Sequence, residues 1–512
     1  MTAVATSVIG DVATTAEELP EAWANARAGD VLALVNGFPF KPSHWKGSGL
    51  PIIRIQNLNN PEAPFNYCPD HIPEKYAVER GDLLFAWSGT PGTSFGAHVW
   101  NGARAWLNQH IFRVEFDDGL FDKRFLRLSI NHNLDEYISQ AQGGVGLAHI
   151  TKRKFDASYL ALPPLAEQKR IVEKVEQLLA RVNAARERLA RVPIIFKRFR
   201  QAVLAAACSG RLTADWRNDG HAELSAEKLL EGISALALKT SVPDGDDPFE
   251  QPEIPQSWRW VRCEDVCKTD RPITYGVIKL GPPIQHGVAT LRSSDVRWLR
   301  IDDSQIKHIS QKIAAAYART LLKGGEVLVT VRGSLGGVAV VPPEMEGFNI
   351  SREVAMLPVH GNLNAKFFSY AIGCASSQAW LSQVTIGVAY TGINIRDLKR
   401  LPVPIPPLEE QREIVSRVET LFKFADAIER RVAAAMARAE KLTQAILAKV
   451  FRGELVPTEA ELSRREGRSY ESASELLARI RATAASQNGQ DSPLRQKVRS
   501  KSRGPKAKSR RA

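Results

Sequence analysis

Side chains that can hydrogen-bond to nucleic-acid bases and phosphates gather in two sets of glycine-containing loops. The first set comprises KPSHWKGSG, RIQNLNN, SGTPGTSFG and HITKRK, and the second comprises TDRPITYGVIK, LRSSDVRW, RGSLGG and TGINIRDLKR. Arginine, glutamine and asparagine form paired hydrogen bonds with guanine or adenine edges, whereas lysine, serine and threonine suit phosphates. For any single residue the alternative is an ordinary solvated loop position. The candidate nucleic-acid-binding residues are Lys46, Arg54, Gln56, Asn57, Ser88, Thr90, Lys152, Arg153, Lys154, Lys279, Arg292, Ser293, Ser294, Arg332, Ser334 and Arg396.

Common catalytic and cofactor-binding motifs are missing. The sequence contains no G-x-x-x-x-G-K-[ST] phosphate loop, no complete G-x-G-x-x-G and no H-E-x-x-H pair. Cys263 and Cys267 form C-x3-C without a second pair at zinc-ligand spacing, so buried thiols are favoured over a metal site. We therefore predict no catalytic residue, no metal site and no cofactor bound by this chain.

Composition limits the class of protein. A chain of 512 residues is too long for one hydrophobic core, so two or more domains are expected. Its five cysteines are scattered and odd in number, which predicts free thiols in a reducing compartment. The beginning of the chain has no signal-peptide pattern, and no apolar stretch reaches the length of about 18 residues that a membrane helix needs. We expect a cytoplasmic protein without membrane contact.

Much of the formal net charge of +13 lies in one segment. Residues 495–511 contain nine lysines and arginines and no acidic residue. This composition predicts a disordered basic tail over residues 485–512. The tail either keeps the protein soluble or attracts phosphates without sequence preference.

The chain repeats itself. PPLAEQKRIVEKVEQLL begins at Pro163, and PPLEEQREIVSRVETLF begins 243 residues later at Pro406. Ten of the first twenty aligned residues are identical, where ordinary residue usage predicts roughly one. The pairs LPEAW and IPQSW, GDLLFAWSG and GEVLVTVRG, QAVLAAACSGRL and QAILAKVFRGEL, and SAEKLLEGI and SASELLARI extend the match. Two copies of one unit are therefore expected.

Each copy contains a long helix with apolar residues at alternating spacings of four and three. That spacing is typical of a coiled-coil seam, and the other copy's helix is the obvious partner. Antiparallel pairing is favoured, with a coiled coil between two chains as the alternative. Pro193 should kink the first helix, whereas its counterpart Met436 should not affect the second. The residues expected in helix pairing or partner docking are Ile171, Val175, Leu178, Val182, Leu189, Ile414, Val418, Leu421, Ile428 and Val432.

The predicted fold class is α+β, with two tandem mixed α/β domains, two long antiparallel coiled-coil helices between them, and a pseudo-twofold internal repeat. Short β-branched or aromatic runs bounded by Gly, Pro and Asn predict strands within each domain. The expected segments are a first domain at 1–162, a spacer helix at 163–215, a helical coda and linker at 216–250, a second domain at 251–405, a second spacer helix at 406–455, a helical coda at 456–484 and the basic tail at 485–512.

The paired PPLxEQ helices, the paired GDLLFAWSG and GEVLVTVRG, and the tandem order of domain and helix resemble the specificity subunits of Type I restriction-modification systems. The resemblance covers the chain to about residue 484. It implies two target-recognition domains that each read half of a bipartite, asymmetric double-stranded DNA sequence, and helices that set the gap between the halves. It implies partners: two modification subunits that dock on the helices, and restriction subunits joined through the complex. S-adenosylmethionine, ATP and Mg²⁺ would be bound by those partners, and this chain would catalyse nothing.

Two other classes of function are possible from the sequence alone. A self-contained DNA methyltransferase or nuclease would need a motif such as [DNS]-P-P-[YFW], and the nearest string, DPFE at Asp247, does not fit. A purely structural coiled-coil adaptor would show no sequence-selective DNA binding when its partners are present. The DNA sequence that is read cannot be derived from loop residues without a known docking pose.

Overall fold

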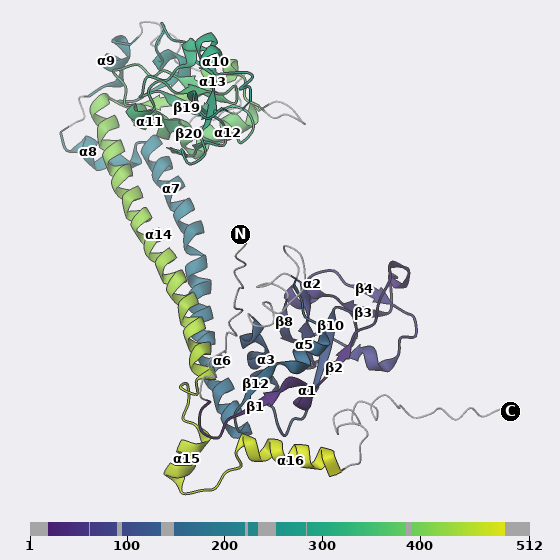
Figure 1. The fold of residues 1–512 in the computed structure, drawn as a ribbon. Helices are drawn as coiled ribbons and strands as arrows, with labels where there is room; N and C mark the ends of the chain where they lie inside the picture. The colour runs from purple at the N-terminus through teal and green to yellow at the C-terminus, as the bar shows by residue number, and fades with distance from the viewer. Residues whose placement is uncertain are drawn as a thin grey trace, which may run out of the picture. The chain divides into compact units, whose positions relative to one another are not determined.

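The computed structural model describes residues 19–60, 62–89, 95–134, 148–220, 224–233, 252–282, 284–385 and 392–486. The chain divides into two compact units, the first made of residues 1–187 and 436–512 and the second of residues 188–435. Each unit combines one globular region with parts of both long helices (Figure 1). The boundaries predicted from the sequence are linear and do not include this return of the chain to the first unit.

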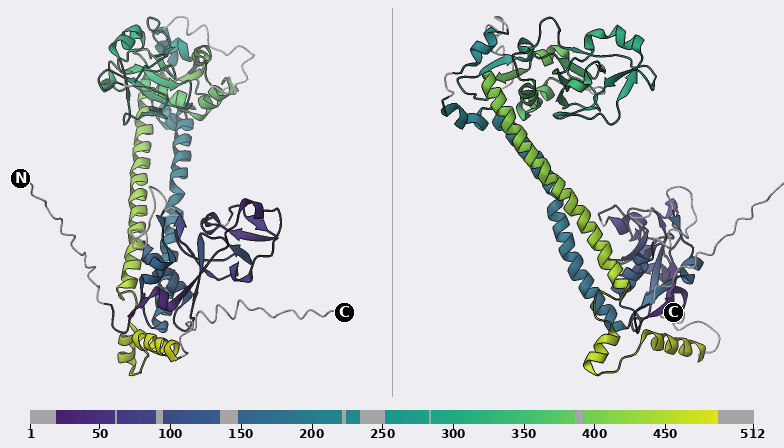
Figure 2. Two further views of the ribbon diagram at one scale, coloured as in Figure 1. Left: turned by 45° about the vertical axis from the view of Figure 1, so that its right-hand side comes forward. Right: turned by 60° about the vertical axis from the view of Figure 1, so that its left-hand side comes forward.

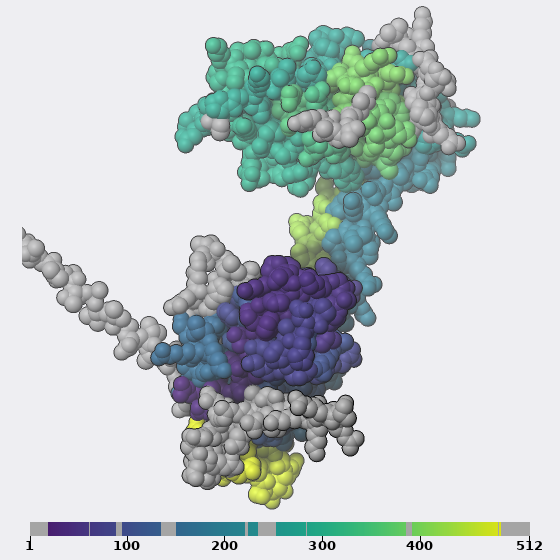
Figure 3. Space-filling model, turned by 90° about the vertical axis from the view of Figure 1, so that its right-hand side faces the viewer, coloured from purple at the N-terminus to yellow at the C-terminus, as the bar shows by residue number. Residues whose placement is uncertain are grey.

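The globular region of the first unit contains two four-stranded sheets. One is antiparallel, with the order β2 (Leu32–Asn36), β10 (Ile111–Phe116), β6 (Leu83–Ala86) and β8 (Gly96–Val99). The other has the order β4 (Asn66–Cys68), β3 (Leu50–Ile53), β9 (Ala105–Leu107) and β5 (Ala77–Val78). Strands β3 and β9 are parallel, and the other neighbours in this sheet are antiparallel. In the space-filling view the purple and blue residues of the first half of the chain form one compact body (Figure 3).

The globular region of the second unit repeats this plan. Its larger sheet has the order β14 (Thr274–Tyr275), β22 (Val354–Leu357), β19 (Val327–Thr330) and β20 (Val338–Val340), again antiparallel. Its smaller sheet has the order β18 (Lys307–Ile309), β15 (Val288–Leu291) and β21 (Asn349–Ile350). Strands β15 and β21 are parallel, as β3 and β9 are. The antiparallel sheets of the two copies therefore have the same strand order, and the mixed sheets correspond except for β5, which has no counterpart among the described strands of the second unit.

A helical segment that follows the last strand of the antiparallel sheet packs into the core of each unit. In the first unit α3 (Lys123–His132) begins after Asp122, whose carboxylate accepts hydrogen bonds from the backbone amides of Arg124 and Phe125. In the second unit the sequence NAKFFSYAIGCASSQAWLSQV, residues 364–384, predicts one helix, and this prediction is wrong. The structure has α11 (Ala365–Gly373) and α12 (Ala375–Gln383), because Cys374 between them is extended, with ψ 159°.

The long helices differ as expected. The first is interrupted: α6 (Leu165–Ala190) is followed after one residue by α7 (Val192–Cys208), which has Pro193 in its first turn. The second, α14 (Leu408–Phe451), is continuous through Met436. The predicted effect of Pro193 is confirmed, since proline removes a ladder hydrogen bond and clashes with the preceding turn.

The long helices pair antiparallel within each unit. In the first unit the beginning of α6 packs against the end of α14, in a cluster that includes Val175, Val182 and Ile446. In the second unit α7 packs against the beginning of α14, and Arg200 forms ion pairs with Asp426 at 2.5 Å and Glu429 at 2.9 Å. The helices run side by side in both views of Figure 2. The partner of each long helix is thus the other helix of the same chain.

Shorter elements complete both units. Antiparallel two-stranded pairs are β1 (Ala24–Arg27) with β12 (Tyr159–Leu162), β7 (Ser88–Gly89) with β11 (Ala148–His149), β13 (Arg259–Arg262) with β23 (Pro402–Ile405), and β16 (Val296–Arg297) with β17 (Arg300–Ile301). Short α-helices are α1 (Ala28–Val31), α2 (Ile55–Asn59), α5 (Lys152–Ala157), α8 (Ala214–Asn218), α9 (Ala226–Glu231), α10 (Gln311–Ala316), α13 (Ile395–Arg400), α15 (Glu459–Glu466) and α16 (Ala473–Ser486). The 3-10 turns are η1 (Pro42–His44), η2 (Glu74–Tyr76), η3 (Arg211–Thr213), η4 (Cys263–Val266), η5 (Ala318–Thr320) and η6 (Pro343–Met345).

The end of the chain belongs to the first unit. Helix α16 packs on the core of that unit through Ala473 and Leu477. It extends to Ser486, and the rest of the predicted basic tail lies outside the described residues. All five cysteines are buried free thiols. Among the described residues, none of the helices combines the length and apolar character that a membrane span requires.

Candidate nucleic-acid interface

In the second unit the loops that carry the candidate residues meet at one turn. This turn, residues 351–353, joins β21 to β22. Its first two backbone amides donate hydrogen bonds of 2.8 Å to the carbonyls of Leu291 and Val277, and the amide of Val331 donates one of 2.8 Å to its last carbonyl. Three candidate loops are therefore fixed to the same short segment. We call this turn the central turn, and the turn with its attached loops the loop frame.

The first unit has the equivalent frame. Its central turn, residues 108–110, follows β9 and precedes β10. The amide of Asn108 donates to the carbonyl of Ile53 at 3.3 Å, and the amide of Gln109 donates to the carbonyl of Phe38 at 3.1 Å. These bonds correspond to the two bonds made by the first amides of the second central turn. The backbone of the frame is therefore repeated although its loop sequences differ.

In each loop frame one loop passes very close to the backbone at or beside the central turn, and a glycine in that loop makes this possible. A Cβ atom on Gly276 would lie 1.8 Å from the carbonyl oxygen of Ile350, and one on Gly37 would lie 2.1 Å from that of Asn108. Neither distance is compatible with a side chain, and the atoms it would meet are backbone atoms. Glycine is required at both positions because the loop crosses directly over the strand end.

The candidate residues of the second unit fall into two groups. Four are exposed on or beside the loop frame, namely Lys279, Arg332, Ser334 and Arg396. The other three lie in the loop after β15 and make contacts within the protein. Arg292 forms an ion pair with Asp295 at 2.9 Å, Ser294 donates to the same carboxylate at 2.8 Å, and Ser293 donates to Glu353 at 2.8 Å. These three side chains hold the loop in shape.

The candidates of the first unit divide in the same way. Asn57 is 2% exposed, and its side chain accepts from the amide of Arg54 at 3.0 Å and donates to the carbonyl of Ala63 at 3.1 Å. Ser88 is also buried. Asn57 therefore fixes the loop after β3, as Asp295 does in the second unit. Lys46 and Arg153 are exposed, while Lys154 is half-buried and Thr90 lies outside the described residues. Gln56 and Lys152 are exposed but also bond within the protein: Gln56 donates to the carbonyl of Pro64 at 3.2 Å, and Lys152 donates to that of Leu34 at 2.9 Å.

An exposed aromatic side chain lies beside these residues. Trp45 is 40% exposed, and the guanidinium of Arg54 lies over its ring, 5.5 Å from the ring centre. Lys46 follows directly, and its amide donates to the carbonyl of Tyr67, another exposed aromatic residue. Aromatic rings next to basic side chains are typical of surfaces that contact nucleic acid. Composition alone did not single out Trp45, since its exposure depends on the fold.

The residues at the tips of the central turns, Gln109 and Arg352, were also missed. Gln109 is half-buried and Arg352 is exposed. They are 243 residues apart, the same offset as the repeated helices, so extending the repeat alignment through the strands would have paired them.

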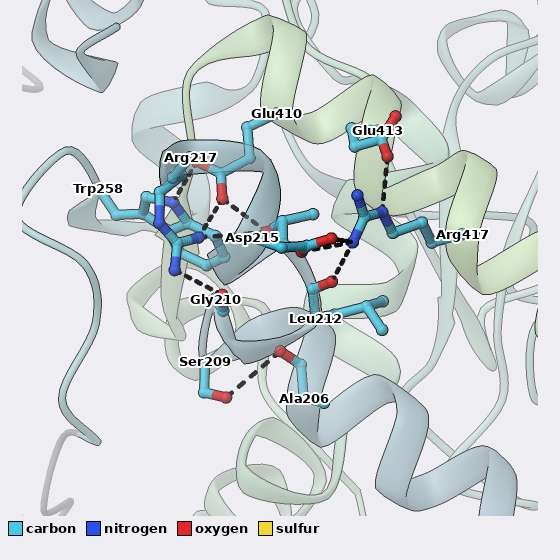
Figure 4. A network of polar contacts seen from close by, with 11 residues as sticks. Ala206, Ser209, Gly210, Leu212, Asp215, Arg217, Trp258, Glu410, Glu413 and Arg417 are labelled. Carbon is cyan, nitrogen blue, oxygen red and sulfur yellow. Dashed lines mark hydrogen bonds and ion pairs between the residues drawn. The ribbon is translucent and has the colours of Figure 1, made fainter. Parts of the chain in front are cut away.

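A buried carboxylate joins the second domain to its helices. Glu410, in the first turn of α14, accepts hydrogen bonds from the indole of Trp258 and the hydroxyl of Thr213, both at 2.7 Å, and forms an ion pair with Arg217 (Figure 4). Glu410 is fully buried. Beside it, Arg417 donates to Asp215 at 2.7 Å and to other groups of the same helix junction. We call this network the second joint.

The first unit has a corresponding first joint. Glu167, also fully buried, accepts from the indole of Trp23 and from the backbone amide of Glu459, both at 2.8 Å. Burial raises the pKa of the Glu167 carboxyl, although these two hydrogen bonds act in the opposite direction. Burial would also raise the pKa of Glu459, but ion pairs with Arg170 at 2.7 Å and Arg468 at 2.6 Å prevail and lower it.

The glutamine that follows each of these glutamates connects the long helix to the shorter core helix. The side-chain oxygen of Gln168 accepts from the amide of Asp122, and that of Gln411 accepts from the amide of Asn364, both at 2.9 Å. Asp122 and Asn364 are the N-cap residues directly before α3 and α11. The repeated PPLxEQ motif is therefore a structural connection in which Glu holds the tryptophan and Gln holds the helix start.

The seam residues differ in burial along the helices. Ile171, Val175, Val182, Ile414 and Val418 are buried. Leu178, Leu189, Leu421, Ile428 and Val432 are only partly buried. Large apolar side chains outside the pairing surface are strongly exposed, namely Ile194, Ile195, Phe424 and Leu442, at 51–60%. Contiguous apolar surface is typical of a protein-binding site, and of these residues Ile194 and Ile195 are neighbours in the chain.

The chain has two similar loop frames with different side chains, and a buried joint connects each of them to the paired helices. This arrangement defines a protein with duplicated recognition domains. The described residues contain no constellation of catalytic groups. The sequence matches the family described as Type I restriction modification DNA specificity domain over residues 20–192 and 256–436. The chain belongs to this family, the specificity subunits of Type I restriction-modification systems. In these systems the specificity subunit is non-catalytic, and catalysis lies on partner subunits.

Individual relatives cover nearly the whole chain. It is 34% identical to the specificity subunit of the Type I restriction enzyme EcoBI from Escherichia coli, over 92% of this chain and 94% of that protein. It is 30% identical to the EcoKI specificity subunit from Escherichia coli (strain K12), over 93% and 98%. A solved structure from a study of assembly and conformational transition of the type I R-M system covers 86% of this chain and all of its own, with 22% identity and a TM-score of 0.56. That structure supports the tandem-domain fold.

Proposed function

We propose that each recognition domain reads one half of a bipartite, asymmetric DNA sequence, and that the paired helices set the distance between the two halves. The observation that carries this proposal is the repeated loop frame. Its backbone bonds recur in both units, whereas the exposed side chains on it differ. Two readers of unlike sequences need a common framework and different contacts.

Partner docking is the second part of the proposal. Because the helix sequences repeat closely, two identical modification subunits can bind the chain in equivalent ways. The exposed apolar side chains Ile194, Ile195, Phe424 and Leu442 offer surface for such contacts. Restriction subunits would join through the assembled complex. S-adenosylmethionine, ATP and Mg²⁺ would be bound by these partners, in the cytoplasm, and adenine methylation and DNA cleavage would take place on them.

The spacing function can be tested by lengthening the paired helices. Four residues inserted after Ala185, together with four inserted after Lys441 in the stretch of α14 that packs against α6, would add about 6 Å of helix. That length corresponds to about two base pairs. The variant is assembled with its modification subunits, and methylated adenines are mapped on DNA of mixed sequence. We expect both half-sites unchanged and a longer gap between them.

Two controls make this experiment decisive. A four-residue insertion after Ile428 with a matching one after Arg198 should have the same effect, because Arg200 and Glu429 place these stretches side by side. The purified chain without partners is incubated with DNA and tritiated S-adenosylmethionine. An unchanged gap in both insertion variants contradicts the spacing role, and methyl transfer by the chain alone contradicts its assignment as a specificity subunit.

A further inference from the structure

Arg352 occupies the centre of the second loop frame. The amide of Arg352 is bonded to Val277, and the neighbouring residues of the turn are bonded to Leu291 and Val331, so its backbone is held from three sides. The side chain is exposed. Among the described residues, no hydrogen bond or ion pair engages its guanidinium. A rigid backbone thus presents a guanidinium with all its donors available.

Gln109 occupies the same place in the first frame. Its amide is bonded to Phe38 at 3.1 Å, which corresponds to the bond between Arg352 and Val277. Its side-chain amide lies 3.2 Å from the Nε2 atom of His110. The two frames therefore keep one backbone geometry at this position and change the side chain from glutamine to arginine.

The exchange of glutamine for arginine indicates what the position contacts. A neutral amide releases no counterion from a phosphate, so the exchange does not preserve a charge contact at this position. Both side chains, however, form paired hydrogen bonds with purines in the major groove: arginine with O6 and N7 of guanine, and glutamine with N6 and N7 of adenine. Three exposed cations on or beside the loop frame, Lys279, Arg332 and Arg396, are side chains of the kind that contact phosphates.

We propose that the tip of each central turn determines the purine at one position of its half-site, with Arg352 selecting guanine in one half and Gln109 selecting adenine in the other. This inference depends on the proposed half-site reading and names the residues and bases through which it operates. Arg292 and Ser293, whose side chains bond within the protein, then position the turn and do not contact bases.

The test replaces each tip residue in the full chain and maps methylated adenines after assembly with the modification subunits. Arg352→Ala should make one guanine position of a single half-site degenerate, with a loss of preference of about 5-fold to 150-fold, and should leave the other half-site and the gap unchanged. Arg352→Gln should shift preference at that position from guanine toward adenine. Gln109→Ala should relax an adenine position in the opposite half-site.

Control variants separate base reading from charge and from folding. Arg352→Lys keeps the charge but loses the paired donors, so it should relax the same position. Arg332→Ala should weaken DNA binding equally for all sequences without changing the recognised motif. Arg319→Ala, on η5, should change neither the binding strength nor the motif. A motif that stays intact in Arg352→Ala and Gln109→Ala overturns the inference. If the unaltered complex recognises no bipartite motif, the proposed function itself fails.

Discussion

Replacing Glu410 with glutamine should destabilise the second unit strongly. The variant keeps the size of the side chain but removes the charge that pairs with Arg217, and its amide group must face one of three donors. Trp258 and Thr213 are nearly or fully buried, so a lost hydrogen bond is not replaced by water. Disrupting a buried ion pair costs about 3–5 kcal/mol, and we expect the lower end because one oxygen remains.

A loss of about 3 kcal/mol in a unit of this size lowers the midpoint of thermal unfolding by about 6–12 °C. Calorimetry measures the midpoint, and hydrogen exchange with mass spectrometry locates the change. Faster exchange is expected in peptides from 208–218 and 408–418, and not in peptides around Trp23 and Glu167. The matched control is Glu409→Gln, which removes an exposed charge from the adjacent position. If both variants unfold at the same temperature, the second joint does not stabilise the unit as argued.

Two further predictions concern the helices and the first joint. Pro193→Ala should raise amide protection at residues 191–196, because it restores a missing hydrogen-bond donor. Met436→Pro in continuous α14 should instead lower the free energy of unfolding by about 3 kcal/mol. Equal effects of the two changes would contradict the role assigned to the break. Glu167 has a raised pKa in the folded chain, so its proton is held more tightly when folded, and its contribution to stability falls as pH rises from the ordinary carboxyl value through the folded pKa. Urea unfolding measured from pH 4 upward should therefore show a smaller loss of stability with rising pH in Glu167→Gln than in the unaltered chain. Parallel curves would refute the assignment.

The repeat made the fold predictable from the sequence. Alternating apolar spacings gave the long helices, the identity of the copies gave the antiparallel pairing within one chain, and Pro193 gave the position of the break. The division of the second core helix at Cys374 was missed, because its backbone turns extended within an otherwise helical apolar pattern. The structure also groups α15 and α16 with the first unit, a point on which a linear division of the sequence makes no statement.

The candidate interface was less predictable. Residue type identified Arg332 and Arg396, which are exposed, but it equally selected Asn57 and Ser293, whose side chains are used inside the protein. A polar side chain in a loop can face solvent or fix the loop, and the sequence alone does not distinguish these states. The PPLxEQ motif was easy to recognise as a family signature, but the sequence did not show its physical role. That role depends on tryptophans more than 140 residues away, which bond to the motif's glutamate in the joints.

The interleaved division of the chain has a consequence for its biosynthesis. The second unit is one uninterrupted stretch of 435 − 187 = 248 residues and can close as soon as that stretch has left the ribosome. The first unit is completed by residues from Met436 onward, so the parts of its core that pack against them stay open while those 248 residues are translated. At 5–20 residues per second the delay is roughly 12–50 s. The domain made first is therefore completed last, and a premature stop near the end of the message would damage the beginning of the protein.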